Sequence, residues 1–190
     1  SSNEKIESVV ATSDGGYIAG GYFESHSIQV GEYTLINNSN TNYSDGIVIK
    51  CSSTGEVEWA ASIGGSNDDE ILAVAETRDG GIVVGGNFKS KKINIGNNTL
   101  TNKYDNNYKG MLIKFNNIGE IEWTKTIEGR GPTISTSHIQ NYIETVFGTN
   151  DGGVVVGGYF GSSEIQIEDT SFENSGEIDG MIIKYNSNGE

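Results

Sequence analysis

The chain has 190 residues, of which 27 are glycine, one is proline and one is cysteine, and its 12 basic and 26 acidic side chains give a formal net charge of −14. A single cysteine excludes an intrachain disulfide, and the negative charge argues against nucleic acid and anionic lipid surfaces as partners. The acidic, cysteine-poor composition, rich in Asn, Ser and Thr, fits a secreted or cell-surface protein, which we expect, and it also fits a cytosolic one. No apolar run approaches the roughly 18 residues of a membrane span, so we expect no membrane insertion.

A repeat of 65–72 residues organises the sequence. Its first motif is Thr-x-Asp-Gly-Gly, followed by an apolar run and a Gly-Gly pair, and its later motifs are a Gly-led apolar run ending in Lys and the sequence Gly-Glu-x-Glu-Trp. The third copy of the last motif reads only Gly189-Glu190. The repeat therefore predicts three units, the third without its last strand. They span residues 1–65, 66–129 and 130–190.

Four strands are expected in each complete unit, because apolar runs rich in Val and Ile alternate with clusters of Gly, Asn, Asp and Ser. The Asp-Gly-Gly sequence supplies a tight turn between the first two strands. Segments 27–36 and 92–100 each have two alternating halves, which predicts an extra hairpin between the second and third strands. The expected strands are 6–12, 17–23, 46–51 and 57–63, then 71–77, 82–88, 110–115 and 121–127, then 143–149, 154–160 and 180–185.

A four-stranded unit of this length cannot bury both of its faces alone, and stacking copies around an axis covers them. We therefore predict an all-β protein with the blades of a β-propeller, each of four antiparallel strands. Three blades are fewer than the roughly four to eight that close a propeller. We expect either a piece of a longer propeller or self-association that completes the ring, with two copies giving six blades.

The third and fourth strands with their connecting turn, followed by the segment 64–70, resemble the bacterial β-propeller repeat family. The Gly-Glu-x-x-Trp ending, which carries Trp59 and Trp123, also resembles the tryptophan-docking repeats of quinoprotein-like propellers. In those repeats each tryptophan packs between neighbouring blades. The resemblance covers almost the whole chain and implies a surface or secreted scaffold whose ligand varies from protein to protein.

No arrangement typical of an enzyme is found in the sequence. The two histidines, His26 and His138, lie in different segments without a nearby Ser or Cys nucleophile, and no zinc, phosphate-loop or paired-cysteine motif occurs. Lys109 stands where the other units carry Asp45 and Asp179, so this position is not a catalytic acid or a ligand in every unit. We expect a protein without catalytic activity.

Aromatic residues in the polar segments between the second and third strands are the main candidates for ligand binding. Tyrosine among Asn and Ser can stack on sugars or fit a protein surface, and a loop lengthened between the second and third units adds a histidine. The expected binding residues are Tyr33, Tyr43, Tyr104, Tyr108 and His138.

The acidic run Asp68, Asp69 and Glu70 offers the oxygen ligands that calcium prefers. It lacks the alternating spacing of a loop that wraps one ion, and a solvated turn is the other interpretation. We expect no cofactor, with calcium at this run as the alternative.

Two functions follow from these observations. The first is a non-catalytic extracellular or cell-surface β-propeller scaffold that binds a protein or glycan through its variable loops. The alternative is a calcium-dependent binding or enzymatic propeller with its site at the ring axis.

Overall fold

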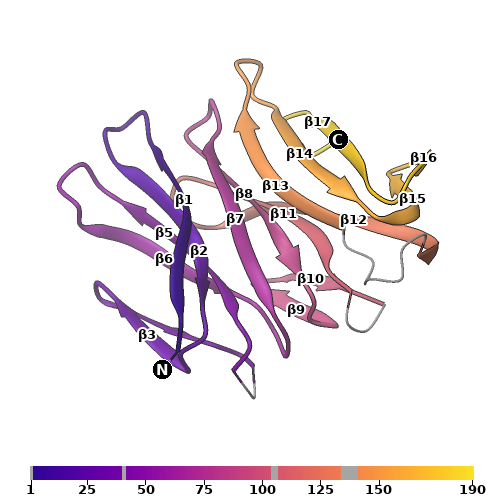
Figure 1. Cartoon of the computed structure of the whole chain (residues 1–190). Helices are drawn as coiled ribbons and strands as arrows, with labels where there is room; N and C mark the ends of the chain where they lie inside the picture. Colours follow the sequence, from indigo (N-terminus) through magenta and orange to yellow (C-terminus); the bar gives the residue numbers. More distant parts are fainter. Residues whose placement is uncertain (1, 40–41, 104–106, 134–140) are drawn as a thin grey trace.

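The computed structural model describes residues 2–39, 42–103, 107–133 and 141–190. Within these ranges the chain forms strands β1 to β17 and no helix, which confirms the all-β prediction. It follows that no helix of the described part is able to cross a membrane. The strands form separate antiparallel sheets that lie one after another in sequence order, and these sheets do not close into a ring (Figure 1).

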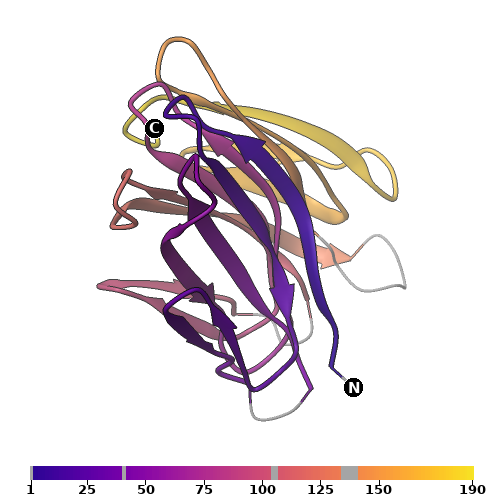
Figure 2. The same ribbon diagram turned by 90° about the vertical axis from the view of Figure 1, so that its left-hand side faces the viewer.

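Sheet 1 contains four antiparallel strands in the order β1-β2-β5-β6. Its strands are β1 (Glu4–Ala11), β2 (Tyr17–Phe23), β5 (Asp45–Cys51) and β6 (Val57–Ile63). All four expected strands of the first unit are present, and the first begins slightly earlier than predicted. In Figure 2 this sheet lies on the side nearest the viewer.

Sheet 2 has six strands in the order β16-β15-β12-β11-β8-β7. Its strands are β7 (Asp69–Glu76), β8 (Ile82–Phe88), β11 (Lys109–Phe115), β12 (Ile121–Thr133), β15 (Ser162–Ile167) and β16 (Thr170–Glu173). β12 runs past residue 129, where the second unit is expected to end, and its second half pairs with β15. The extension forms because β15 supplies partners for backbone groups that an edge strand would leave open.

Sheet 3 has three strands in the order β13-β14-β17. They are β13 (Asn141–Gly148), β14 (Val154–Phe160) and β17 (Asp179–Tyr185). Within the described residues, β17 pairs only with β14, so its outer edge is open.

The predicted extra hairpins are present in the first two units as separate two-stranded sheets. They consist of β3 (Ser27–Val30) with β4 (Tyr33–Ile36), and of β9 (Lys92–Ile95) with β10 (Asn98–Thr101). The third hairpin is the β15–β16 pair that joins sheet 2.

Each Asp-Gly-Gly turn is held by one aspartate. The Asp14 carboxylate accepts hydrogen bonds from the Thr12 hydroxyl at 2.5 Å and from the Gly16 amide at 2.8 Å. Gly15 has a φ of 86°, a left-handed conformation that glycine adopts without strain. The buried Lys50 ammonium then pairs with the same carboxylate at 2.8 Å. The lysine motif of each unit therefore locks the turn that precedes it; the equivalent pairs are Lys114–Asp79 and Lys184–Asp151.

Glycine in the second strand of a unit lets neighbouring sheets pack closely. A Cβ atom at Gly20 would lie 2.5 Å from Val74 and 2.8 Å from Ile71, both on the first strand of sheet 2. A Cβ atom at Gly85 would lie 2.6 Å from Val146 and 2.7 Å from Ile143, both on the first strand of sheet 3. All four apolar side chains are buried, and this repeated contact forms much of the core between the sheets.

Candidate functional site

The structure places the sequence-predicted binding residues in different surroundings. Tyr33 is 37% exposed on hairpin β3–β4, and its hydroxyl donates to the Glu58 carbonyl at 2.6 Å. Tyr43 is 39% exposed in the segment before β5. Neither ring pairs with Tyr108 among the described residues. Tyr104 and His138 lie outside the described residues.

Tyr108 belongs to a row of three tyrosines. Its ring centroid lies 5.2 Å from that of Tyr142, which in turn stacks on Tyr159 at 5.2 Å. The Lys89 ammonium lies over the Tyr108 ring at 5.4 Å from its centroid, a cation–π geometry. All three tyrosines are partly exposed, so the row forms an aromatic surface between sheets 2 and 3.

The first strands of the sheets bring this row next to charged residues. Strands β1, β7 and β13 lie side by side in Figure 1. Tyr142 and Tyr159 are cross-strand partners in sheet 3, and the equivalent partners in sheet 2 are Glu70 and Asn87. In sheet 1 the equivalent pair is Lys5 and Tyr22. Because the sheets stack, these three equivalent cross-strand pairs lie in a line, one pair from each sheet.

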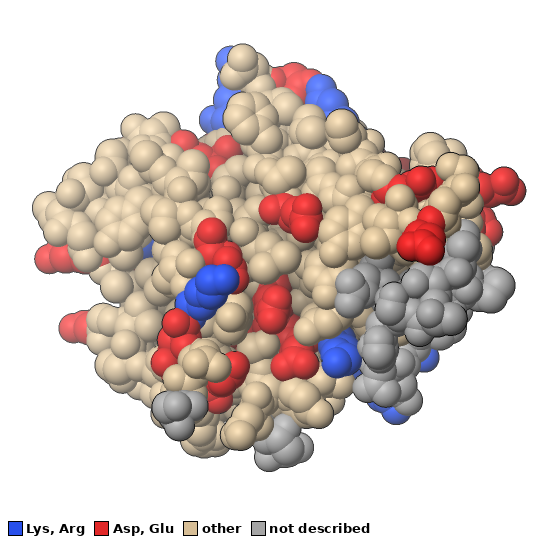
Figure 3. Space-filling model, viewed as in Figure 1, with Lys and Arg blue, Asp and Glu red and all other residues tan. Residues whose placement is uncertain are grey.

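Carboxylates gather beside the tyrosines. Figure 3 shows several acidic side chains around one basic group in the middle of this face. Glu7 pairs with Lys5 at 2.8 Å, and the Asp68 carboxylate lies 3.8 Å from the Lys89 ammonium. We define the acidic–tyrosine surface as Glu7, Asp68, Glu70, Tyr108, Tyr142 and Tyr159.

The electrostatics of this surface favour cations. Burial raises the pKa of Glu70, and the negative charges of Asp68 and Glu7 raise it further. Burial also raises the pKa of Tyr108, again with a contribution from nearby carboxylates. The tyrosine hydroxyls therefore stay protonated at neutral pH, and a positive group at this surface would relieve the repulsion between the carboxylates.

The acidic run 68–70 does not converge on one point. Asp69 is buried and accepts hydrogen bonds from the Ser90 hydroxyl at 2.6 Å and from the Gly65 amide at 2.8 Å. Burial raises the pKa of Asp69 to about 7, although the hydrogen bonds from Ser90 and Gly65 act to lower it. Its carboxyl therefore holds the loop before β7, while Asp68 faces Lys89. In the described part of the chain, no group of three acidic, His or Cys side chains could hold a metal ion, and the calcium site stays a prediction.

The variable position of the third strand has a structural role in every unit. Asp45 accepts from the Asn38 amide at 2.8 Å, and Asp179 accepts from the Ser175 amide at the same distance. Lys109 instead donates to the Thr101 carbonyl at 2.9 Å. At this position an acidic side chain or a basic one therefore makes a hydrogen bond that holds the preceding segment at the start of the third strand.

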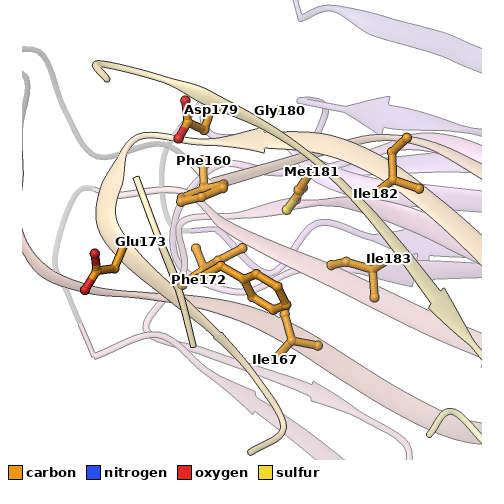
Figure 4. Close-up of a pocket in the computed structure, with 10 residues that line it drawn as sticks. Phe160, Ile167, Phe172, Glu173, Asp179, Gly180, Met181, Ile182 and Ile183 are labelled. Carbon is orange, nitrogen blue, oxygen red and sulfur yellow. The ribbon is translucent and has the colours of Figure 1, made fainter. Parts of the chain in front are cut away.

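A pocket of about 370 Å³ lies between hairpin β15–β16 and β17. Figure 4 shows Phe160, Phe172 and Met181 turned toward it. The equivalent residues of the first unit are Phe23 and Ile47 of sheet 1 and Leu35 of hairpin β3–β4, and they form a buried cluster against which Ala60 of β6 packs. The pocket is therefore the place that a fourth strand fills in sheet 1. It is lined by Phe160, Ile165, Ile167, Phe172, Glu173, Asp179, Gly180, Met181, Ile182 and Ile183.

Sequence reasoning did not identify Tyr142 or Tyr159 as binding residues. Tyr159 directly follows a Gly-Gly pair and is explained by packing, and Tyr142 lies just before an expected strand, outside the polar segments in which binding residues are expected. One signal was available in the sequence. Position 142 is occupied by Lys5 in the first unit and Glu70 in the second, so the repeat keeps the strand there but not the side chain. A side chain that varies at one position of an otherwise constant repeat is typical of exposed positions that can carry function.

No protein-family model matches this chain, and no curated protein matches its sequence. The repeated sheets and the acidic–tyrosine surface are therefore the observations from which a function can be argued.

Proposed function

We propose that this protein is a non-catalytic binding scaffold of the β-propeller type, acting outside the cell, and that its acidic–tyrosine surface binds a protein partner through a basic segment. The propeller assignment is supported by three related units stacked face to face through the same glycine and tryptophan contacts. An extracellular location is compatible with the acidic composition and its many Asn and Ser residues.

The observation that carries the ligand class is the combination of clustered carboxylates with stacked, partly exposed tyrosines. Asp68 and Glu7 raise the pKa of Glu70, because the three carboxylates repel one another. A bound cation would reduce this repulsion. An arginine side chain matches both features, because its guanidinium pairs with carboxylates and stacks on aromatic rings. Lys89 over Tyr108 shows the same contact within the chain.

A peptide rich in arginine and glycine is a suitable probe, with binding followed by isothermal calorimetry on the intact chain. The net charge of −14 attracts any cation, so the specific site needs a control of equal charge. We compare the double variant Asp68→Asn, Glu70→Gln with Glu56→Gln, Glu120→Gln, which removes the same charge from two exposed turns. The first pair should weaken binding about ten-fold and the second about two-fold or less.

Tyr142→Ala should also weaken peptide binding about ten-fold without changing the net charge. Equal losses for the two double variants, with none for Tyr142→Ala, would reject the site in favour of non-specific attraction. Binding of neutral oligosaccharides that requires Tyr142 would favour a glycan ligand instead. Binding that requires added calcium would favour the ion-dependent alternative.

A further inference from the structure

One contact joins the sheets twice within this chain. Ile71 and Val74 of β7 pack over Gly20 of sheet 1, and Ile143 and Val146 of β13 pack over Gly85 of sheet 2. A second glycine, at the start of the third strand, receives the same isoleucine in each case: a Cβ at Gly46 would lie 3.0 Å from Ile71, and one at Gly110 would lie 3.1 Å from Ile143. In both interfaces two apolar side chains from the first strand of one sheet fill a recess on the preceding sheet. Two glycines form the bottom of this recess.

The projecting half of this contact is exposed at one end of the stack. Ile6 and Val9 of β1 occupy the repeat positions of Ile71 and Val74. They are 47% and 62% exposed, whereas Ile71 and Val74 are 0% and 6% exposed. In Figure 1 sheets 2 and 3 both lie on the same side of sheet 1, so no described sheet packs against its outer face. The pair Ile6 and Val9 therefore repeats the apolar side of the internal contact but has no partner.

The receiving half is exposed at the other end. Gly157 and Gly180 of sheet 3 correspond to the recess glycines of sheets 1 and 2. A Cβ at Gly180 would meet nothing within 4 Å, and one at Gly157 would meet only Thr145 of its own sheet. Ile182, beside this recess, is 84% exposed, while its equivalents Val48 and Leu112 are both 0% exposed. These residues border an open hollow of about 580 Å³.

We propose that a second copy of this chain docks the Ile6 and Val9 face of its β1 into the recess around Gly157, Gly180 and Ile182. The occupant is a copy of this chain because the two surfaces are the two halves of an interface that already forms twice in the molecule. Beyond the ligand binding proposed above, this interface defines how the protein assembles.

Backbone geometry supports the same arrangement. The Asp69 amide donates to the Ser44 carbonyl at 2.8 Å across the first interface, and the Asn141 amide donates to the Tyr108 carbonyl at 3.4 Å across the second. By the repeat, the Glu4 amide of the second copy would donate to the carbonyl of Ile178, which is 60% exposed. The docking surface thus combines apolar contact with a defined backbone register.

The interface joins two different surfaces, so it is heterologous and leads either to a closed ring or to an open chain of copies. Within the chain, Trp59 caps the turn at Gly119 and Trp123 caps the turn at Gly189, whereas a Cβ at the equivalent Gly55 of sheet 1 would meet nothing within 4 Å. Because the proposed contact joins separate molecules, its extent depends on protein concentration.

The test is sedimentation equilibrium of the intact chain over a range of protein and salt concentrations. We expect a reversible increase from 20.3 kDa, to twice that mass for a closed two-copy ring and to higher multiples for an open chain of copies. Added salt should strengthen association, because it screens the repulsion between acidic copies. The basic peptide binding proposed above has the opposite salt dependence, so failure of one proposal is distinguishable from failure of the other.

Two exposed substitutions test the two halves, and both positions are exposed enough for the fold to tolerate the change. Val9→Lys and Ile182→Lys should each abolish association, whereas Ile118→Lys, at a 65% exposed position in the β11–β12 turn, should leave it unchanged. Circular dichroism melting curves would confirm that each variant is folded.

Mixing the two disabling variants gives the sharpest result. The Val9→Lys chain keeps an intact recess and the Ile182→Lys chain keeps an intact β1 face, so an equimolar mixture should restore a two-copy species. A monomeric parent chain at all concentrations would overturn the proposal. So would association that only Val9→Lys disrupts, or a mixture that stays monomeric, since both results indicate a β1-to-β1 contact or another surface.

Discussion

Trp59 of β6 donates its indole N–H to the backbone carbonyl of Asn117, 3.2 Å away in the turn of the neighbouring sheet. Its ring also packs against Phe115, with centroids 5.4 Å apart. Trp123 makes the same hydrogen bond to Ser187 at 3.1 Å. One tryptophan per complete unit thus fastens each sheet to the next, as the resemblance to tryptophan-docking repeats implies.

Trp59→Phe should lower the free energy of unfolding by about 2 kcal/mol, because the variant loses the hydrogen bond and part of the packing at a side chain that is only 7% exposed. Trp123→Phe should cost less, since Trp123 is partly exposed. Urea denaturation of both variants measures the difference. A larger loss at Trp123 would contradict the view that burial sets the contribution of each tryptophan.

A matched glycine pair tests the packing between sheets. Gly110→Ala should destabilise the fold by roughly 1–2 kcal/mol, because its Cβ would lie 3.1 Å from the buried Ile143. Gly180→Ala, at the same repeat position with nothing within 4 Å, should change stability by less than about 0.5 kcal/mol or raise it slightly. Thermal unfolding in dilute solution distinguishes them, and equal losses would refute the packing role of Gly110.

The Asp79 turn should make stability fall in acid. Burial favours the protonated form of Asp79, but hydrogen bonds from Lys114 and Thr77 lower its pKa from 3.8 to about 2. A depressed pKa contributes stability above pH 3.8 that is lost as the pH falls toward 2. Because the side chain is 51% exposed, we expect a contribution of about 1 kcal/mol after solvent screening.

Asp79→Asn should therefore reduce stability at neutral pH and flatten its decline between about pH 4 and pH 2. Asp151→Asn is the matched control. Hydrogen bonds from Lys184 and Thr149 also lower the pKa of Asp151, but both side chains of its ion pair are more than half exposed, so solvent screens the interaction, whereas Lys114 is 2% exposed. The control should show the smaller change in denaturation curves recorded across this range. An unchanged acid slope in Asp79→Asn would contradict the assignment.

The open edge of β17 should accept a strand with the sequence of β6. Lys50 pairs with Glu58 of β6 at 3.0 Å, and Lys114 pairs with Glu122 at 2.8 Å, whereas Lys184 has only Asp151 as an ion-pair partner among the described residues. A peptide of residues 55–65 should raise the melting temperature by pairing with β17 and covering the adjacent apolar pocket.

The control peptide carries Glu58→Lys, which replaces attraction to Lys184 by repulsion. It should bind about five-fold more weakly, as expected for one partly exposed ion pair. A melting temperature that neither peptide changes would show that strand addition does not occur at this edge.

Much of the fold could be predicted from the sequence because its signals are local. Alternating apolar residues place the strands, and Asp14 with Gly15 explains the first turn through side-chain and φ requirements that involve only near neighbours. The extension of β12 could not be predicted in the same way. Its second half is a strand because β15, far away in sequence, pairs with it.

The candidate site was only partly predictable. Tyr108 was identified from its segment, but its neighbour Tyr142 follows an interval of more than thirty residues and lies on a strand of another sheet. The acidic run 68–70 looked like one cluster in sequence, whereas alternation along the strand start turns Asp69 inward and leaves Asp68 beside Lys89.

The sequence by itself determined the repeat, the strands and the turns, since these depend on side-chain periodicity and on backbone conformations set within a few residues. The tertiary structure decided which copies of a repeat position meet. Sheet stacking alone places Tyr142 beside Tyr108, buries Val74 but exposes Val9, and leaves Gly157 without a neighbouring sheet. The same residue pattern is core in one unit and surface in another, because burial depends on the neighbour that covers it.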